Sequence, residues 1–244
     1  MLKRFFDILI SFIGLLFFSP ILLPVLIIIW SYDKKSPFYI APRVGKDGRI
    51  FKMVKLRSMI IDADKTGVDS TSNSDLRITP IGKKIRKFKL DELTQLWNVF
   101  FGEMSLVGPR PNVKIETDFY TNSEKKLLSI KPGITDFSSI VFSDEGKILE
   151  DKKDPDLAYN QLIRPWKSRL GLIYIKHRSF LLDLEIMIIT MISLFSKRKA
   201  LILLTKKLQS LNVDREIINI SKREIELYPY PPPGQDHIVE HRSK

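Results

Sequence analysis

A long uncharged segment near the N-terminus constrains this chain more than any other feature. No residue from position 8 to position 30 carries a charge. A helix of this length would cover roughly 35 Å, which is enough to cross a lipid bilayer once. A secretory signal is disfavoured, because the segment is long for a signal and no small-residue cleavage site precedes Asp33. The sequence therefore predicts a membrane segment over residues 1–33.

Prolines in the middle of this segment favour a bent, re-entrant hairpin of two half-helices. Pro20 and Pro24 each remove a backbone donor and clash with the preceding turn. The freed carbonyls then need a partner, either a side chain such as Ser19 or neighbouring protein. A proline-kinked helix that spans the membrane is the alternative. Positive charge marks the cytoplasmic side of a membrane segment, and both flanks carry it: Lys3, Arg4, Lys34 and Lys35.

The composition of the whole chain predicts a packed core and an anionic partner. Hydrophobic residues make up 44% of the 244 residues and charged residues 28%, which argues against wholesale disorder. Forty Lys and Arg against 28 Asp and Glu give a net charge of +12, which favours nucleic acid, acidic lipid or a phosphorylated substrate. The cations alternate with acids and no nucleic-acid motif is present, so nucleic acid is not expected. The chain has no cysteine and three histidines, which excludes thiol nucleophiles and argues against a histidine triad.

Turn signals and hydrophobic spacing predict a mainly helical α+β body with a small β-hairpin. Two short apolar runs flank a glycine-containing turn, as in a hairpin. A threonine cap followed by proline begins a basic helix. A second helix has apolar residues at helical spacing and a glycine where it ends. The expected elements are strands at 37–43 and 50–54, a helix from Thr79 to Phe88 and a helix from Leu90 to Gly102.

The remaining segments complete a division into three regions. Residues 64–75 are polar and are expected to form a loop. Residues 179–195 and 200–204 have the composition of amphipathic interfacial helices, and residues 228–234 that of an extended or flexible proline-rich tail. The predicted regions are the membrane segment 1–33, a body at 34–199 and a C-terminal extension at 200–244.

An acidic pair, Asp91 and Glu92, is the first candidate site. Both lie in the first turn of the second helix, where acids that compensate the helix dipole are common. Their surroundings favour phosphate chemistry, because a basic helix leads into them and Lys55 and Arg57 lie upstream. Mg²⁺ takes one or two carboxylates together with phosphate oxygens. The nearby cations and the helix dipole are also expected to favour the ionised form of Asp91.

Two rigid turns follow the acidic pair. Pro109 and Pro111 restrict the backbone on both sides of Arg110, and a fixed guanidinium suits bidentate recognition of phosphate. A surface loop with a solvated arginine is the ordinary alternative. Residues 131–135 form the second rigid turn, which contains another cation, Lys131.

Together these segments resemble the bacterial polyprenyl-phosphate sugar-1-phosphate transferases, the monotopic phosphoglycosyl transferases of surface glycan assembly. The resemblance runs from about Lys3 to Thr190, and the ordered set of motifs is highly specific. The motifs are Lys-Arg-Phe-Phe-Asp at 3–7, Ser19-Pro20, Arg43 with Gly45, Gly48 and Phe51, Lys-Leu-Arg-Ser-Met at 55–59, Leu-Asp-Glu-Leu at 90–93, Gln-Leu-Trp-Asn-Val at 95–99, and the segments 104–111, 131–135 and 160–183.

The resemblance implies a re-entrant helix in the bacterial cytoplasmic (inner) membrane and a catalytic domain, residues 34–199, on the cytoplasmic face. It implies a UDP-sugar donor, a polyprenyl phosphate acceptor, Mg²⁺ as cofactor and a role in exopolysaccharide or lipopolysaccharide synthesis. Membrane lipids are further partners, and a homodimer is left open. The family's acidic dyad corresponds to Asp91, the nucleophile of a covalent sugar-phosphate intermediate, and Glu92, the metal ligand. The residues expected to bind phosphate are Arg110, Lys55, Arg57 and Arg86.

Two other functions are compatible with the residues. In one, Asp91 is a general base in a single displacement without a covalent intermediate. In the other, the chain is a basic, membrane-anchored scaffold without enzymatic activity, for which Asp91 would be dispensable.

The chain departs from the family pattern in places. Thr94 stands where proline is common, and Leu56 where phenylalanine is common. Residues 136–139 replace a glycine-tryptophan segment that is expected near the sugar, so the identity of the sugar stays open. Residues after 199 have no recognised counterpart. The chain is expected to be a minimal catalytic form without the extra transmembrane domain of larger relatives.

Overall fold

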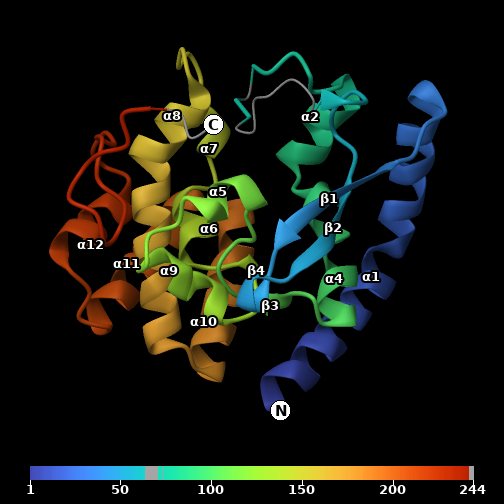
Figure 1. Ribbon diagram of the computed structural model, residues 1–244. Helices are drawn as coiled ribbons and strands as arrows, with labels where there is room; N and C mark the ends of the chain where they lie inside the picture. The colour runs from blue at the N-terminus through green and yellow to red at the C-terminus, as the bar shows by residue number, and fades with distance from the viewer. Residues whose placement is uncertain (64–70, 73, 242–244) are drawn as a thin grey trace.

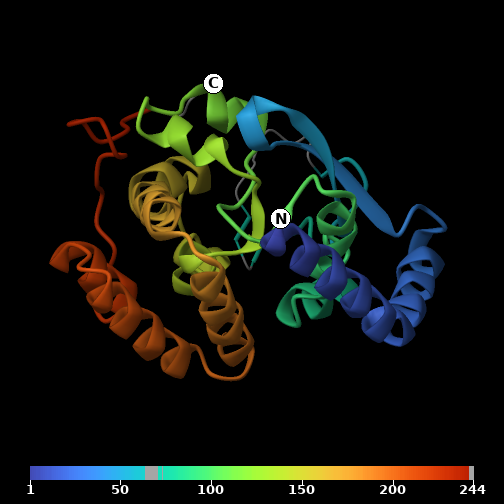
Figure 2. The ribbon, with the colours of Figure 1, turned by 90° about the horizontal axis from the view of Figure 1, so that it is seen from below.

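The N-terminal segment is one long bent helix in the computed structural model, which describes residues 1–63, 71–72 and 74–241. This helix, α1, spans Leu2–Asp33 and contains both prolines. Figure 2 shows its two arms meeting at an angle, and a proline inside a helix is the usual cause of such a bend. Among the described residues, α1 is the helix long and apolar enough to cross a membrane by length and composition.

The carbonyl freed by the first proline has the partner that the sequence predicts. Because Pro20 has no N–H, the carbonyl of Leu16 loses its helical hydrogen bond. The Ser19 hydroxyl donates to this carbonyl at 2.7 Å. The predicted half-helices are therefore two arms of a single bent helix.

The predicted β-hairpin is confirmed, and a second strand pair accompanies it. Strands β1 (Phe38–Val44) and β2 (Ile50–Leu56) pair antiparallel, with Phe38 opposite Leu56 and Val44 opposite Ile50. A short 3-10 turn, η1 (Lys46–Gly48), joins them. Strands β3 (Ser105–Val107) and β4 (Gly133–Thr135) pair in parallel and were not predicted. Most of the loop predicted at 64–75 lies outside the described residues.

The helices after the hairpin begin and end at the predicted signals. In α2 (Pro80–Lys87), the Thr79 hydroxyl accepts a hydrogen bond from the Gly82 N–H at 3.0 Å. The predicted second helix is divided into α3 (Leu90–Leu93) and α4 (Leu96–Phe101). Gly102 ends α4 with φ 88°, a conformation that favours glycine.

Short helical segments lead into a C-terminal group of longer helices. Figure 1 shows α9 to α12 on one side of the molecule and α1, α2 and α4 on the other, with β1 and β2 on the same side as α2 and α4. The elements are α5 (Lys114–Asp118), η3 (Glu124–Ser129), α6 (Phe137–Val141), α7 (Glu145–Ile148), α8 (Pro155–Ala158), η4 (Tyr159–Ile163), α9 (Arg164–His177), α10 (Phe180–Phe195), α11 (Lys197–Ser210) and α12 (Arg215–Lys222).

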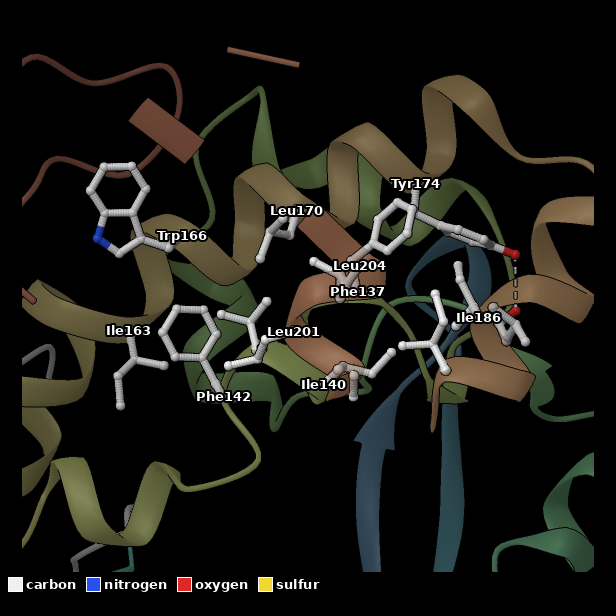
Figure 3. Close-up of a cluster of buried hydrophobic side chains, with 14 of the residues drawn as sticks. Phe137, Ile140, Phe142, Ile163, Trp166, Leu170, Tyr174, Ile186, Leu201 and Leu204 are labelled. Carbon is white, nitrogen blue, oxygen red and sulfur yellow. Dashed lines mark hydrogen bonds between the residues drawn. The ribbon is translucent and has the colours of Figure 1, made fainter. Parts of the chain in front are cut away.

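The main hydrophobic core joins the C-terminal helices to the body. Figure 3 shows Phe137 of α6, Leu170 and Tyr174 of α9, and Leu201 and Leu204 of α11 packed together. Residues after 199 therefore contribute to the same core as the body. The proline-rich tail forms neither helix nor strand and packs on the body, with the Tyr230 ring centroid 4.3 Å from that of Trp166.

Both ends of α1 are bound to the body. Arg4 donates to the Val99 and Phe100 carbonyls at 2.5 and 2.7 Å, which satisfies carbonyls in the last turn of α4. Lys3 pairs with buried Asp183 of α10 at 2.5 Å. Asp7 accepts from the Leu106 N–H of β3 at 3.1 Å. At the other end, Asp33 pairs with Arg57 at 2.5 Å.

Candidate active site

The acidic pair lies at the start of α3, directly after a sharp turn. Lys89 adopts a left-handed conformation with φ 56°, which interrupts the helical backbone and separates α2 from α3. Asp91 and Glu92 then occupy the first turn of α3, and both are partly buried. The turn places the carboxylates between the basic helix α2 and the strand β2, which contacts α3.

Two polar residues fix β2 against the helices that follow it. The Thr94 hydroxyl lies 3.1 Å from the Val54 carbonyl and 3.2 Å from the Asp91 carbonyl. The Asn98 side chain accepts from the Val54 N–H at 3.0 Å and donates to the Lys52 carbonyl at 2.7 Å. These contacts place Lys55, the residue after Val54, beside the acidic pair. The threonine that replaces the family's proline thus contributes contacts that proline cannot make.

Arg110 reaches the same site from the end of β3. Its guanidinium pairs with Oε1 of Glu92 at 2.9 Å. The loop that carries it lies tightly on the 131–135 turn, where the Gly133 N–H donates to the Pro109 carbonyl at 2.9 Å. A Cβ on Gly133 would lie 2.1 Å from the Gly108 nitrogen. The second rigid turn therefore supports the loop that holds Arg110.

The two adjacent carboxyl groups have opposite pKa shifts. Burial raises the pKa of Asp91, although Lys55 opposes this effect. Burial alone would also raise the pKa of Glu92, but Arg110, Lys89 and Lys55 outweigh it and lower this pKa to about 2. Lys55, Arg86 and Arg110 do favour the ionised form of Asp91, but desolvation by burial has the larger effect and gives the net rise in its pKa. The more basic carboxylate of the pair is Asp91.

The pKa values of the neighbouring cations are also shifted by their shared environment. Burial, reinforced by the positive charge of Arg110, lowers the pKa of Lys55 to about 8. The charge of Glu92 raises the pKa of Arg110 above its ordinary value. Arg86 of α2 donates to the Ser58 hydroxyl at 3.0 Å and interacts electrostatically with Asp91. The structure thus brings Lys55, Arg86 and Arg110 to the acidic pair.

Arg57 is not placed with the other candidate residues. Its guanidinium is buried and bonds both carboxylate oxygens of Asp33, at 2.5 and 2.7 Å. A third contact, at 3.5 Å, reaches the Ile29 carbonyl. In this structure Arg57 therefore joins the C-terminal end of α1 to β2.

Three further charged residues surround the site. Glu145 of α7 pairs with Lys167 of α9 and interacts electrostatically with Arg110. Lys89 also acts on Glu92. Glu145 and Lys167 were not singled out in the sequence, because neither lies near the acidic pair or in a rigid turn. Their separation along the chain gives no sequence signal of their proximity.

The segment that departs from the family pattern is mainly structural. Asp136 accepts from the Ser139 N–H at 2.7 Å and so caps α6. Asp136, Phe137 and Ser138 are all buried. The expectation that this segment lies at the sugar is not supported for these three residues, which have little exposed surface for a ligand.

The site suits a metal that arrives with a phosphate ligand. Among the described residues, no cluster of three or more acidic or histidine side chains could hold a metal alone. Mg²⁺ commonly binds through one or two carboxylates and completes its shell with phosphate oxygens and water. Asp91 and Glu92 supply carboxylates, and the Arg110 pair uses Oε1 of Glu92. The donor set therefore fits Mg²⁺ bound together with a diphosphate.

Comparison with known proteins identifies the class of this protein. Residues 1–197 match the bacterial sugar transferase family, and the chain belongs to that family. The matched residues include α1, the acidic pair, Arg110 and the 131–135 turn. Residues 198–244, with nearly all of α11 and the whole of α12, lie outside the match.

Of three similar relatives, two have names that describe transferases and one is named for exopolysaccharide production. The chain is 33% identical over 202 residues to the UDP-glucose:undecaprenyl-phosphate glucose-1-phosphate transferase of Klebsiella pneumoniae, covering 81% of this chain and 41% of that protein. It is 41% identical over 152 residues to the UDP-galactose-lipid carrier transferase of Erwinia amylovora, covering 55% and 31%. It is 36% identical over 150 residues to the exopolysaccharide production protein ExoY of Rhizobium meliloti, covering 55% and 66%. The chain thus spans less than half the length of the first two relatives.

Proposed function

We propose that this protein transfers a sugar-1-phosphate from a UDP-sugar to polyprenyl phosphate at the cytoplasmic face of the bacterial inner membrane. The observation that carries the proposal is the acidic pair at the start of α3, enclosed by Lys55, Arg86 and Arg110. This arrangement suits a diphosphate, because the cations offset the repulsion between phosphate and carboxylate. The names of the relatives support a UDP-sugar donor and an undecaprenyl phosphate acceptor.

The chemistry proceeds in two displacements. A carboxylate oxygen of Asp91 attacks the sugar-bearing phosphorus of the donor, the bond from that phosphorus to the bridging oxygen breaks, and UMP leaves with that oxygen. An oxygen of polyprenyl phosphate then attacks the same phosphorus and displaces the Asp91 carboxylate. The product is a polyprenyl-diphosphate sugar. Two easier steps replace one difficult step, which is the benefit of covalent catalysis.

The two acids have different roles because their environments differ. The raised pKa of Asp91 makes its carboxylate the more basic and hence the better nucleophile. Glu92, whose pKa is about 2, stays ionised and holds Arg110. Glu92 and Asp91 would hold Mg²⁺, which neutralises the charge of a bound diphosphate.

The proposed membrane placement follows from the exposed apolar surface. The bend of α1 exposes large apolar side chains, including Leu16 and Phe17. The α10–α11 corner exposes Leu194 and Phe195, and α11 exposes Ile202 beside basic residues. Figure 2 shows the bend of α1 and the α10–α11 corner along the same edge of the molecule. We assign this edge to the membrane, with α1 re-entrant and α10 and α11 interfacial.

Trapping the intermediate tests the proposal. Purified protein is mixed with a panel of UDP-sugars and Mg²⁺ without acceptor, and UMP is measured. The expected result is at most one UMP per active site and an added sugar-phosphate mass on the peptide that contains residues 90–95. Asp91→Asn should abolish both, since an amide is a poor nucleophile. Asp91→Glu should also fail, because a shift of about 1 Å misplaces the attacking oxygen.

The alternatives predict different results in the same experiment. Asp118→Asn, which changes an exposed acid paired with Lys114, is the matched control and should retain the adduct. UMP that appears only with polyprenyl phosphate, with no adduct under rapid quenching, would favour a single displacement with Asp91 as base. No UMP from any donor, even with acceptor, would favour the non-enzymatic scaffold.

A further inference from the structure

Two adjacent residues at the start of α7 contact different elements of the molecule. Asp144 binds Lys197 Nζ at 2.6 Å and lies 3.6 Å from a guanidinium nitrogen of Arg223. Glu145 instead pairs with Lys167 and acts on Arg110 in the site. One peptide bond therefore separates a contact to the C-terminal helices from a residue that interacts electrostatically with Arg110 of the active site.

The C-terminal side of this link is firmly held. Lys197 begins α11, and Arg223 caps the end of α12. Arg223 has φ 58°, a strained conformation for a residue other than glycine. Its guanidinium carbon lies 5.6 Å from the centroid of the buried Phe142 ring. The partly buried charge of Arg223 is thus fixed beside Asp144, in a region that the family match does not cover.

Two ion pairs hold the site side of the link. One joins Lys167 to Glu145 and the other joins Arg110 to Glu92. Lys167 pairs with Glu145 and lies 5.3 Å from the Tyr159 ring centroid. Arg110 bonds Glu92 at 2.9 Å and also experiences the charge of Glu145. The guanidinium therefore pairs with an acid of the dyad and also interacts electrostatically with an acid of α7. A displacement of α7 would change the balance between these two acids.

We propose that α11 and α12, acting through Lys197, Arg223 and Asp144, position Glu145 so that Arg110 is oriented to bind the diphosphate of the donor. Asp144 and Arg223 are positioning residues in this proposal, since neither touches the dyad. The inference rests on the proposed function and extends it. It gives residues 198–244 a role in the activity of a site that lies within residues 1–197.

Kinetic measurements on four variants test this coupling. The donor KM and kcat are measured by UMP release with polyprenyl phosphate present, for Asp144→Asn, Arg223→Gln, Arg223→Lys and Glu145→Gln. Asp144→Asn and Arg223→Gln should each raise the donor KM by about 10-fold, the lower end of the loss seen when residues that orient a binding group are changed. Arg223→Lys should restore most of the loss, because the charge is retained.

A double variant separates positioning from general destabilisation. If Asp144 acts through Glu145, adding Asp144→Asn to Glu145→Gln should raise KM no further. The matched control is Glu216→Gln, which removes an acceptor of Tyr228 and Tyr230 in α12 without touching Asp144. Its donor KM should equal that of the wild type. The inference would be overturned if the increases in donor KM of the two single variants add in the double variant. It would also be overturned if these increases correlate with the loss in Tm and not with loss of the contact to Asp144.

A binding measurement distinguishes failure of this inference from failure of the proposed function. The Kd of UDP with Mg²⁺ is measured by calorimetry for the same variants. Normal turnover of Asp144→Asn with unchanged KM and Kd refutes the inference and leaves the transferase intact. Absence of turnover in the wild type refutes the proposed function, and an unchanged Kd in Asp144→Asn then refutes the inference as well. A Kd weakened in Asp144→Asn but not in Glu216→Gln supports it.

Discussion

At the scale of single residues, burial and charge act differently on two neighbouring carboxyl groups. Asp91 faces Lys55 but loses more from desolvation than it gains from that cation, so its pKa rises. Glu92 has a direct guanidinium partner, so its pKa falls to about 2. Environments that separate the pKa values of two neighbouring acids commonly give the two acids different catalytic roles. This difference supports the proposal that Asp91 is the nucleophile and that Glu92 is a metal ligand.

The first prediction at this scale concerns pH. Lys55 has a pKa of about 8, so its positive charge is present below pH 8 and is lost as the pH rises through that value. A diphosphate needs the charged form, and kcat/KM for the donor should therefore fall above about pH 8. Lys55→Arg keeps the charge at high pH and should move this fall to higher pH. Steady-state UMP release is measured from about pH 6 to about pH 10, roughly two units either side of the pKa of Lys55, and gives both profiles.

A neighbouring lysine provides the control for this profile. Lys52 lies on the same strand, and its side chain is exposed. Lys52→Arg should leave the profile unchanged. An alkaline limb that is identical in wild type and Lys55→Arg would show that another group is responsible.

The second prediction at this scale concerns the metal. Glu92→Gln removes one of the two proposed carboxylate ligands and should raise the Mg²⁺ concentration for half-maximal activity by about 10-fold or more. Chelation of Mg²⁺ and Glu92→Gln should give losses that do not add, because one metal site is lost by either route. Titration of activity with Mg²⁺ measures both effects. Glu185→Gln, which changes a surface pair with Lys207, should keep the wild-type Mg²⁺ curve; unchanged Mg²⁺ dependence in Glu92→Gln would remove the ligand role.

At the scale of elements, short segments position the site because their ends are fixed by specific contacts. The β3–β4 pair is three residues long on each strand. It is nevertheless held on its other edge by Asp7 of α1, which accepts from the Leu106 N–H. The loop with Arg110 leaves β3 directly. The site thus depends on elements that are far apart in the chain.

The third prediction belongs to this scale. Gly133→Ala would place a Cβ 2.1 Å from backbone of Gly108, so the strand pair must move apart. The cost should be about 1–3 kcal/mol, as for other overpacked substitutions, together with reduced donor binding through the displaced Arg110 loop. Thermal unfolding and UMP release measure these two effects. Gly171→Ala is the control, because its Cβ would meet the end of the Leu127 side chain, which can move; equal effects of the two variants would contradict the prediction.

The elements that the sequence predicts correctly are those with local signals. The Thr79 cap, the Gly102 end of α4 and the β-hairpin each depend on residues adjacent in the chain. The β3–β4 pair and the Glu145–Lys167 contact join distant segments, for which three-residue strands and isolated charges give no periodic signal. The pairing of Arg57 was not predicted for the same reason, because its partner Asp33 lies 24 residues away in the chain. Charge near the acidic pair predicts a cationic site but does not specify which cations reach it.

At the scale of the whole molecule, the two ends of α1 constrain how the chain can meet a membrane. Lys3, Arg4 and Asp7 attach one end to α10, α4 and β3, and Asp33 attaches the other to β2 through Arg57. A helix that spans the bilayer would place these ends on opposite sides of about 30 Å of hydrocarbon. Both ends are instead bonded to one folded body. This geometry supports the re-entrant placement proposed above.

The last prediction tests this placement with single cysteines. The chain has no native cysteine, so Leu2→Cys and Lys35→Cys each introduce one thiol at an exposed position outside the ion pairs of α1. An impermeant thiol reagent should label neither residue in intact cells and both after the membrane is opened. Lys84→Cys, on the exposed side of α2, is the control for the cytoplasmic body and should behave in the same way. Labelling of Leu2→Cys or Lys35→Cys from outside, with Lys84→Cys protected, would rule out the re-entrant helix.

Replacing Ser19, Pro20 and Pro24 by leucine restores the backbone donors that the prolines remove. If the bend keeps both ends on one side, this straightened variant should expose one of the two cysteines to the reagent in intact cells.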